Sequence, residues 1–381
     1  MEKKERKRIV IVGDLFPVPS NYKRFEEGDV NYLIGDKITQ LFDDADYRIC
    51  NLEGTLTDGA EQCEKTGPVV LAPTNAVNAI KAMGINCCML ANNHITDAGH
   101  QGVIDTIKTI NHAGLEYLGA GNDIDSIIHH KIVKIGQISV GLYNVCETMY
   151  NQPSKKRAGA YIYDEYLVCK ELENIKKKCD YIIVIYHGGA EKFRYPSPQT
   201  RKRFHRMVDS GADMILSQHT HCVGSEEYYK GAYLLYGQGN FLFRSFNNEF
   251  TNTGLIIELV FDNGKPMINK HLVRAIADTV RYDDKQDFGD FVIRSQRIDD
   301  EDYITQKYDE YCMSELATYL SAFKSRFLGR SFLRRFFPKV YKYYLINKGY
   351  DRYNLLFTLH TLRSEQNRET AVRGIEVLLG L

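Results

Sequence analysis

Short apolar runs along the first part of the chain are each followed by polar side chains that can bind a metal or move a proton. The runs consist mostly of β-branched and aliphatic residues and are bounded by Gly and Asn, a pattern that predicts buried strands. They lie at residues 9–12, 47–50, 85–90, 181–186 and 214–216. The pattern therefore predicts at least five buried strands.

The candidate side chains that follow these runs are all drawn from Asp, Glu, Asn and His. Along the chain they are Asp14, Glu53 (within Asn51-Leu52-Glu53), Asn93, His94, His187, His219 and His221. Side chains just beyond the carboxyl ends of neighbouring strands converge on one crevice in an open α/β sheet. We therefore expect these residues, which are far apart in the sequence, to form a single metal site.

Helical patterns alternate with the strands in the first half of the chain. Apolar residues recur at helical spacing over 102–113, 166–178 and 199–211, and Gly114 and Gly211 stop two of these segments. Strand patterns then dominate at 232–236, 254–261 and 267–276. Mixed sheets with helices outside predict an α/β fold, a layered sandwich. We place this domain at residues 1–285 and a helical C-terminal extension at 286–381.

Composition and charge exclude several classes of protein. The chain has 49 basic and 49 acidic residues and a formal net charge of zero, so no global charge favours nucleic acid. Its nine cysteines are scattered, with no C-x-x-C, which favours a reduced, intracellular protein over a disulfide framework. We find no signal peptide and no run of about 20 apolar residues. A cytoplasmic protein, or one peripheral to the membrane, is expected.

Each candidate side chain also has an ordinary structural interpretation. In an extended segment His219 and His221 would point to the same side, and neutral imidazoles suit zinc, iron, manganese or nickel. Asp14 is either a hard oxygen ligand or a turn residue, and His187 is either a ligand or a buried, hydrogen-bonded histidine. Asp97 either orients His94 or stabilises the N-terminus of a helix.

Taken together, these motifs resemble the poly-γ-glutamate capsule-synthesis (CapA-type) family, a branch of the calcineurin-like metallophosphoesterase superfamily. The resemblance runs from about residue 9 to residue 243 and keeps the order of the motifs. They are Gly13-Asp14, Asn51-Leu52-Glu53, Asn92-Asn93-His94 with Asp97, His187-Gly188-Gly189-Ala190-Glu191, His219-Thr220-His221 and Gly239-Asn240-Phe241. It implies an α-β-β-α sandwich with metals at the strand ends.

The resemblance also implies a role for each residue. Asp14 and His221 would hold one metal, Asn93, His187 and His219 would hold the other, and Glu53 would bridge them. His94 would protonate a leaving oxygen, with Asp97 beside it. Phe16 stands where the superfamily has a histidine, so the first metal lacks a ligand and the site holds either one or two ions. We expect divalent manganese, iron or zinc, without being able to choose among them.

The function implied is a metal-dependent hydrolase in the biosynthesis of capsule or cell-envelope polymers, poly-γ-glutamate or polysaccharide. Two metals can generate hydroxide from bound water and stabilise the entering and leaving oxygens, which suits phosphoesters and also amide or ester carbonyls. The alternatives are a non-catalytic scaffold or regulator in a capsule-synthesis complex and a general intracellular phosphatase. Glu191, Arg194 and Asn240 are candidates for the substrate pocket; otherwise they are surface or turn residues.

Residues 324–348 carry only basic charges, interleaved with Phe and Tyr. Such a segment could dock on an anionic membrane surface. We favour the alternative, in which the aromatic side chains pack on the main domain and the basic ones form a solvated face, because Pro338 interrupts any single long helix.

Overall fold

Two β-sheets form the centre of the molecule in the computed structural model, which describes residues 6–243, 248, 250–262, 266–321 and 351–380. The chain divides into two compact units. The main unit comprises residues up to 63, 69–147 and 151–305, and the second comprises residues 64–68, 148–150 and 306 onward. Each unit is described by itself below.

The larger sheet has the strand order β18-β17-β16-β1-β2-β5-β6, and β15 pairs with β1. Strands β1, β2, β5 and β6 run parallel to one another, while β16, β17 and β18 continue the sheet antiparallel from β1. The bounds are β1 (Lys7–Leu15), β2 (Tyr47–Leu52), β5 (Cys87–Met89), β6 (Glu116–Leu118), β15 (Asn240–Leu242), β16 (Thr253–Phe261), β17 (Met267–Ile276) and β18 (Thr279–Tyr282).

The second sheet has the order β13-β14-β12-β11-β9-β8, with β9, β11, β12 and β14 parallel and the two edge strands antiparallel. Two short pairs, β3 with β4 and β7 with β10, complete the strands. The bounds are β8 (His130–Ile135), β9 (Ile138–Cys146), β11 (Tyr181–His187), β12 (Met214–Gln218), β13 (Glu226–Tyr229), β14 (Ala232–Leu235), β3 (Thr55–Leu56), β4 (Leu71–Ala72), β7 (Ala120–Gly121) and β10 (Gly159–Ala160).

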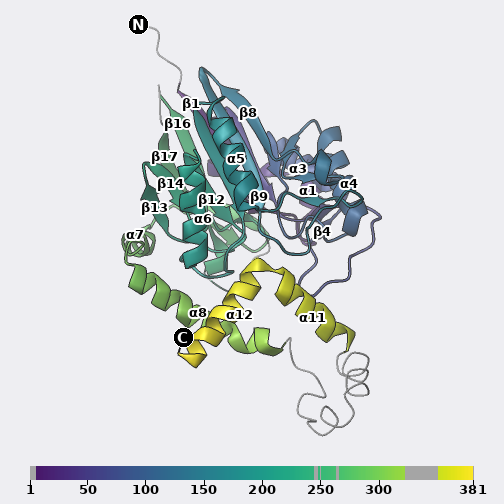
Figure 1. Ribbon diagram of the computed structural model, residues 1–381. Helices are drawn as coiled ribbons and strands as arrows, with labels where there is room; N and C mark the ends of the chain where they lie inside the picture. The colour runs from purple at the N-terminus through teal and green to yellow at the C-terminus, as the bar shows by residue number, and fades with distance from the viewer. Residues whose placement is uncertain (1–5, 244–247, 249, 263–265, 322–350, 381) are drawn as a thin grey trace. The chain divides into compact units, whose positions relative to one another are not determined.

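Helices cover the outer face of each sheet (Figure 1). Those that pack on the larger sheet are α1 (Tyr22–Glu27), α2 (Val30–Asp43), α3 (Val77–Ala82) and α4 (Gly99–His112). Those on the second sheet are α5 (Glu165–Lys176) and α6 (Pro198–Asp209). A third apolar cluster joins the two sheets face to face. Each of the three clusters fills one of the three interfaces between adjacent layers in a stack of helices, sheet, sheet and helices. The predicted α-β-β-α sandwich is confirmed.

The layering explains why the strands are continuous apolar runs. Side chains of a strand point alternately to its two faces. In β1, Ile9 and Ile11 enter the cluster between the sheets, whereas Val10 and Val12 contact the helices. A strand that is covered on both faces has no solvated side to make polar, so the uninterrupted apolar pattern is the physical consequence of its position.

The C-terminal helices pack against one another within the second unit. They are α8 (Glu301–Ser321), α11 (Arg352–Arg363) and α12 (Glu365–Leu379). Arg373 of α12 makes a two-pronged ion pair with Asp309 of α8, with N–O distances of 2.5 and 2.8 Å. The backbone of Gly374 comes so close to α8 that an added Cβ would lie 3.0 Å from the carbonyl oxygen of Cys312. A helical C-terminal extension is confirmed for these residues.

The division between the units falls later in the chain than the predicted boundary at residue 285. Helix α7 (Gly289–Gln296) contributes Phe291 to the cluster between the sheets, and Ile298 and Ile304 join the cluster under α5 and α6. Apolar burial therefore attaches the chain to the main unit as far as Thr305. The basic, aromatic segment 324–348 lies outside the described residues.

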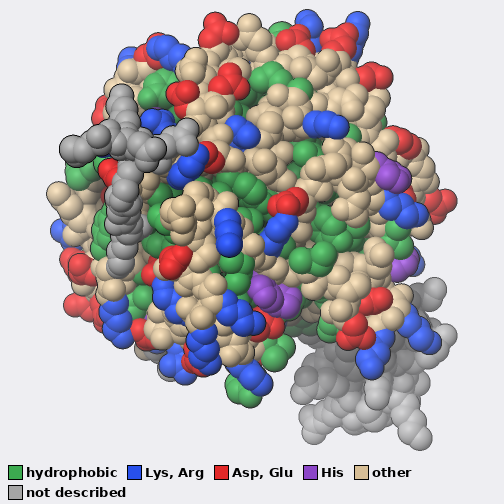
Figure 2. Space-filling view, turned by 90° about the horizontal axis from the view of Figure 1, so that it is seen from above, with side chains coloured by type: hydrophobic (Ala, Val, Ile, Leu, Met, Phe, Trp, Pro, Cys, Tyr) green, Lys and Arg blue, Asp and Glu red, His purple; other side chains and the backbone are tan. Residues whose placement is uncertain are grey.

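Surface charge and helix hydropathy are ordinary in the described part of the chain. On the face shown in Figure 2, Lys and Arg alternate with Asp and Glu among the side chains that the structure describes, without a large area of one sign. Among the described helices, none combines the length and the apolar character needed to cross a bilayer.

Candidate metal centre

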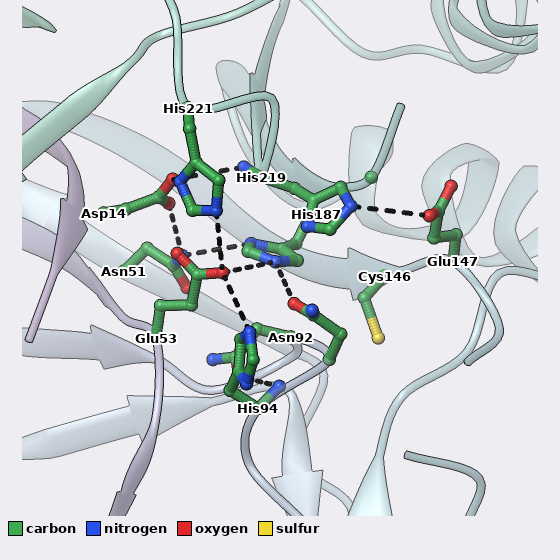
Figure 3. A network of polar contacts seen from close by, with 12 residues as sticks. Asp14, Asn51, Glu53, Asn92, His94, Cys146, Glu147, His187, His219 and His221 are labelled. Carbon is green, nitrogen blue, oxygen red and sulfur yellow. Dashed lines mark hydrogen bonds and ion pairs between the residues drawn. The ribbon is translucent and has the colours of Figure 1, made fainter. Parts of the chain in front are cut away.

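The carboxyl ends of the parallel strands bring the predicted polar residues together at one edge of the sandwich. Asp14 belongs to the end of β1, Glu53 follows β2, Asn93 and His94 follow β5, His187 ends β11, and His219 and His221 follow β12. All of these side chains are buried. Figure 3 shows the carboxylates and histidines of this set converging, with the Glu53 carboxylate between the rings of His94, His187 and His221. The convergence expected from the sequence is present.

Glu53 is the centre of the cluster. Its Oε1 atom lies 3.5 Å from His187 Nε2, 3.8 Å from His221 Nε2 and 3.9 Å from His94 Nε2. Both carboxylate oxygens are buried and neither has a hydrogen-bond partner within the described structure. A buried carboxylate left in that condition is costly, so its position indicates a ligand with positive charge.

Two overlapping groups of potential ligand atoms share Glu53. One consists of Glu53, His187 and His219, and the other of Asp14, Glu53 and His221; the ligand atoms within each group lie within 4.8 Å of one another. Asn93 joins the first group through its Oδ1, which is 2.7 Å from His187 Nε2. This is the partition that the resemblance implied, with Glu53 common to both groups.

The backbone conformation at the two histidines of His219-Thr220-His221 differs from the extended one that we expected from the sequence. The φ angle is 87° at His219 and 52° at His221, so this segment is not extended. We predicted that the alternation of side chains along a strand would point both rings to one side, and that explanation is wrong. Both rings nevertheless reach the site, with centroids 6.0 Å apart. Left-handed conformations at residues with side chains are costly and concentrate at functional sites.

Phe16 occupies the space beside Gly54, the residue that follows Glu53. A Cβ added to Gly54 would lie only 2.4 Å from the Phe16 ring, and Phe16 is fully buried. An aromatic ring thus packs where the resemblance led us to expect a ligand, and the Asp14 group has no histidine from this segment.

His94 and Asp97 form a hydrogen-bonded pair at the edge of the cluster. His94 Nδ1 lies 2.7 Å from Asp97 Oδ2, and the same carboxylate oxygen accepts the backbone N–H of Val70 at 2.7 Å. Of the two roles that the sequence left open for Asp97, the structure favours the one in which it orients His94. With Nδ1 held by Asp97, His94 presents Nε2 toward Glu53.

Both polar atoms of the Asn240 side chain make hydrogen-bond contacts. Its Oδ1 lies 2.9 Å from His221 Nδ1, and its Nδ2 donates to the carbonyl oxygen of Thr251 at 2.9 Å. When Nδ1 of a histidine is held in this way, Nε2 becomes the nitrogen free for a metal. This geometry makes Asn240 a support for His221, whereas the sequence interpretation placed it in the substrate pocket.

The other two substrate candidates lie in the loop that follows β11. Glu191 is exposed and Arg194 is half-buried. The backbone N–H of Lys192 donates to the carbonyl oxygen of Thr220 at 2.7 Å, which joins this loop to the segment carrying His219 and His221. Glu191 and Arg194 are therefore at the border of the cluster, where substrate contacts are possible.

Glu147 is a site residue that the sequence interpretation missed. It follows β9, is buried, and has its Oε1 3.8 Å from His219 Nε2 (Figure 3). Its Oε2 accepts the backbone N–H of Gly189 at 3.2 Å. The other ring nitrogen of His219, Nδ1, is buried with no hydrogen-bond partner in the described structure. A carboxylate on one side of a histidine and an unsatisfied nitrogen on the other is the arrangement of a supported metal ligand.

The protonation states of the cluster differ from one proposed ligand to the next. Burial lowers the pKa of His187 and of His219 to about 3, so both rings are neutral and ready to coordinate. Burial would also lower the pKa of His221, but the carboxylates of Glu53 and Asp14 outweigh it and raise that pKa to about 10. Burial, followed by repulsion from Asp14, raises the pKa of Glu53 well above its ordinary value.

Metal affinity is therefore expected to rise with pH. In the metal-free protein His221 keeps its proton through the neutral range because its pKa is about 10, and a metal must displace that proton. Each displaced proton changes the apparent affinity about tenfold per pH unit below the pKa. Calorimetric titration of metal-free protein with Mn²⁺ between about pH 6 and pH 8 measures this slope. An affinity that does not change with pH would contradict the assigned protonation of His221.

Comparisons with known proteins agree with these observations. A sequence model of the family described as "Bacterial capsule synthesis protein PGA_cap" matches residues 8–245. The chain is 30% identical over 205 residues to the capsule biosynthesis protein CapA of Bacillus anthracis, covering 52% of this chain and 50% of that protein. It is 28% identical over 214 residues to the PGA biosynthesis protein CapA of Bacillus subtilis, covering 54% and 55%. The chain thus spans about half the length of the curated relatives it matches.

Solved structures with a similar fold include a novel phosphatase from Mycoplasma pneumoniae, with a TM-score of 0.46 and 16% identity. That comparison covers 75% of this chain and 99% of the other. A calcineurin-like phosphoesterase, YfkN of Bacillus subtilis, gives a TM-score of 0.43 at 11% identity, covering 80% and 97%.

Proposed function

The chain belongs to the bacterial capsule synthesis protein family, and on that premise we propose that it is a metal-dependent hydrolase acting in the biosynthesis of an anionic capsule or envelope polymer. The observation that carries the proposal is the Glu53 carboxylate, buried without a hydrogen-bond partner at the meeting point of two groups of ligands. A protein that served only as a scaffold would have no use for so costly an arrangement.

The residues present fit one or two divalent transition-metal ions. Imidazole nitrogens and carboxylate oxygens together suit manganese, iron and zinc. Asp14 and His221 would hold one ion, His187, His219 and Asn93 would hold the other, and Glu53 would contact both. When bound, the ions would supply Lewis acidity toward a phosphoryl or carbonyl oxygen and activate water as the nucleophile.

The remaining chemistry belongs to side chains of this protein. His94 presents Nε2 toward Glu53 and, when protonated there, donates its proton to the leaving oxygen. Asp97 holds His94 Nδ1 at 2.7 Å, which fixes the orientation of the ring. His94 Nε2 is 3.9 Å from Glu53 Oε1, so the proton donor lies beside the carboxylate that would hold the ions and is not itself needed to hold them.

Phosphoester hydrolysis is the reaction we favour, because a charged phosphoryl group gains most from two adjacent cations and a proton donor. The substrate would be a phosphoester linked to polymer assembly, and the protein would act in a capsule-synthesis complex. The experiment is a panel of phosphomonoester, phosphodiester and γ-glutamyl substrates, offered to the full-length protein loaded with Mn²⁺, Fe²⁺ or Zn²⁺. Metal-dependent turnover of a phosphoester supports the proposal. Metal binding without turnover of any substrate would favour the scaffold instead.

A further inference from the structure

Two arginines meet at the loop that follows His221. Arg194 comes from the loop after β11, and Arg294 comes from α7, which lies beyond the part of the chain matched by the family model. Arg194 Nε donates to the carbonyl oxygen of Val223 at 3.1 Å, and Arg294 Nη2 donates to the same oxygen at 3.3 Å. Arg294 Nη2 also donates to the carbonyl oxygen of Gly224 at 3.2 Å. Two positive groups thus share one acceptor.

This pair has no ion-pair partner in the part of the chain that the structure describes, and the carboxylate of Asp290 on α7 attracts Arg294 only from a longer distance. Neither guanidinium makes an ion pair with a described carboxylate, although Arg294 is only 8% exposed. Its Nε atom is buried and has no hydrogen-bond partner among the described residues. Burying a charge without a counter-charge costs several kcal/mol, and the neighbouring Arg194 adds repulsion. Burial, followed by that repulsion, lowers the pKa of Arg294 to about 10.

Arg194 contacts the segments on either side of the proposed metal centre residue His221. Val223 lies two residues after His221 in the sequence, and the guanidinium of Arg194 stacks on the ring of Phe250 at 4.6 Å. The next residue, Thr251, accepts the hydrogen bond from Asn240, the side chain that contacts His221. Arg194 therefore lies against the same segments that position the His221 ring.

Capping of backbone carbonyls is the simplest alternative role for the pair. Carbonyl oxygens can be satisfied by neutral donors or water, and one of these oxygens is contacted by both arginines. Capping also leaves the terminal nitrogens of Arg194 without a partner among the described residues, and neither arginine makes an ion pair with a carboxylate in the same part of the chain. An anion bound between the two arginines would explain three features together: the carbonyl oxygen that both contact, the repulsion between their charges, and the nitrogens without a partner.

We propose that Arg194 and Arg294 form an anion-binding subsite that holds a second anionic group of the substrate, a phosphate or a carboxylate, beside the metal centre. Its use in substrate binding rests on the proposed function; anion binding itself does not. The subsite makes the substrate class a polyanion, with one group at the metal centre and another at the arginines, rather than a simple phosphomonoester. Arg194 contacts the anion, and the buried charge of Arg294 strengthens its attraction.

The test is anion binding by full-length, metal-free protein in the presence of a chelator. Inorganic phosphate, or a γ-linked glutamate trimer as the carboxylate probe, is titrated against NaCl of matched ionic strength, and affinity and melting temperature are measured. We expect wild type to bind at least one probe, and Arg194→Gln to weaken binding about tenfold or more. Arg206→Gln, which removes an exposed arginine whose partner is Glu165, should bind as wild type does.

Arg294→Gln is the second variant. Arg294 also donates hydrogen bonds to two carbonyl oxygens, so its loss can lower the stability of the protein by itself. The melting temperature of the variant with anion is therefore compared with that of the same variant without anion. We expect the anion to raise the melting temperature less than it does in wild type. Binding of phosphate alone identifies a phosphate subsite, and binding of the trimer alone identifies a carboxylate subsite. Equal binding by wild type and Arg194→Gln, or no binding beyond the NaCl control, would overturn the proposal. Anion binding without metal-dependent turnover would instead count against the proposed hydrolase alone.

Discussion

Replacing His94 with Asn is expected to lower turnover roughly 10²–10⁴-fold, the usual contribution of a positioned acid or base, while metal content stays at the wild-type level. The reason is geometric: His94 is held by Asp97 through Nδ1 and presents Nε2 beside Glu53, but neither group of ligands needs it. Turnover of the best substrate and elemental analysis of the same preparation measure the two quantities together.

The matched control for this variant is His112→Asn. His112 is exposed in the last turn of α4, outside the cluster, so its loss should leave both turnover and metal content unchanged. If His94→Asn loses metal together with turnover, His94 is a ligand and the proton-donor role is wrong.

Replacing Glu53 with Gln is expected to affect stability differently with and without metal: wild type should be the more stable protein only when metal is bound. Without metal, the variant should be as stable as wild type or more so, because burial opposes the charge of Glu53 and no hydrogen bond compensates it. With metal at about 100 times its dissociation constant, wild type should gain about 2.7 kcal/mol, and the variant should gain far less. Denaturant unfolding with Mn²⁺ and with a chelator measures both differences.

Glu258→Gln supplies the comparison for Glu53. Glu258 on β16 is equally buried, but it accepts hydrogen bonds from Arg8 and Asn269 and pairs with His271. Removing its charge should cost about 1–3 kcal/mol, by the same amount with and without metal. A Glu53→Gln variant that behaved in this way would show that Glu53 is an ordinary structural carboxylate.

The sequence predicted the layers and the convergence of the site because both follow from local patterns. A strand buried on both faces must be apolar throughout, as in β11, and a parallel strand places the residues at its end on the carboxyl edge of the sheet, as with His187. The same rule applies to Glu147. Strand β9 ends at Cys146, and the next residue is the missed carboxylate.

Other features depend on contacts between distant segments, which local patterns do not contain. The left-handed residues His219 and His221 flank Thr220, whose carbonyl oxygen accepts a hydrogen bond from Lys192 of the loop after β11. The use of Asn240 as a support for His221 depends on the position of Thr251. Helix α7 belongs to the main unit because Phe291 fits between the sheets. In each case tertiary packing decides, and a single sequence gives no measure of it.

The most direct test of the metal centre is elemental analysis of the purified full-length protein, wild type beside the double variant His219→Ala/His221→Ala. The two substitutions remove one ligand from each group that shares Glu53. We predict one or two transition-metal ions per chain in wild type and a clearly lower content in the double variant, with the main unit still folded. Equal metal content in the two proteins would contradict the assignment of the site.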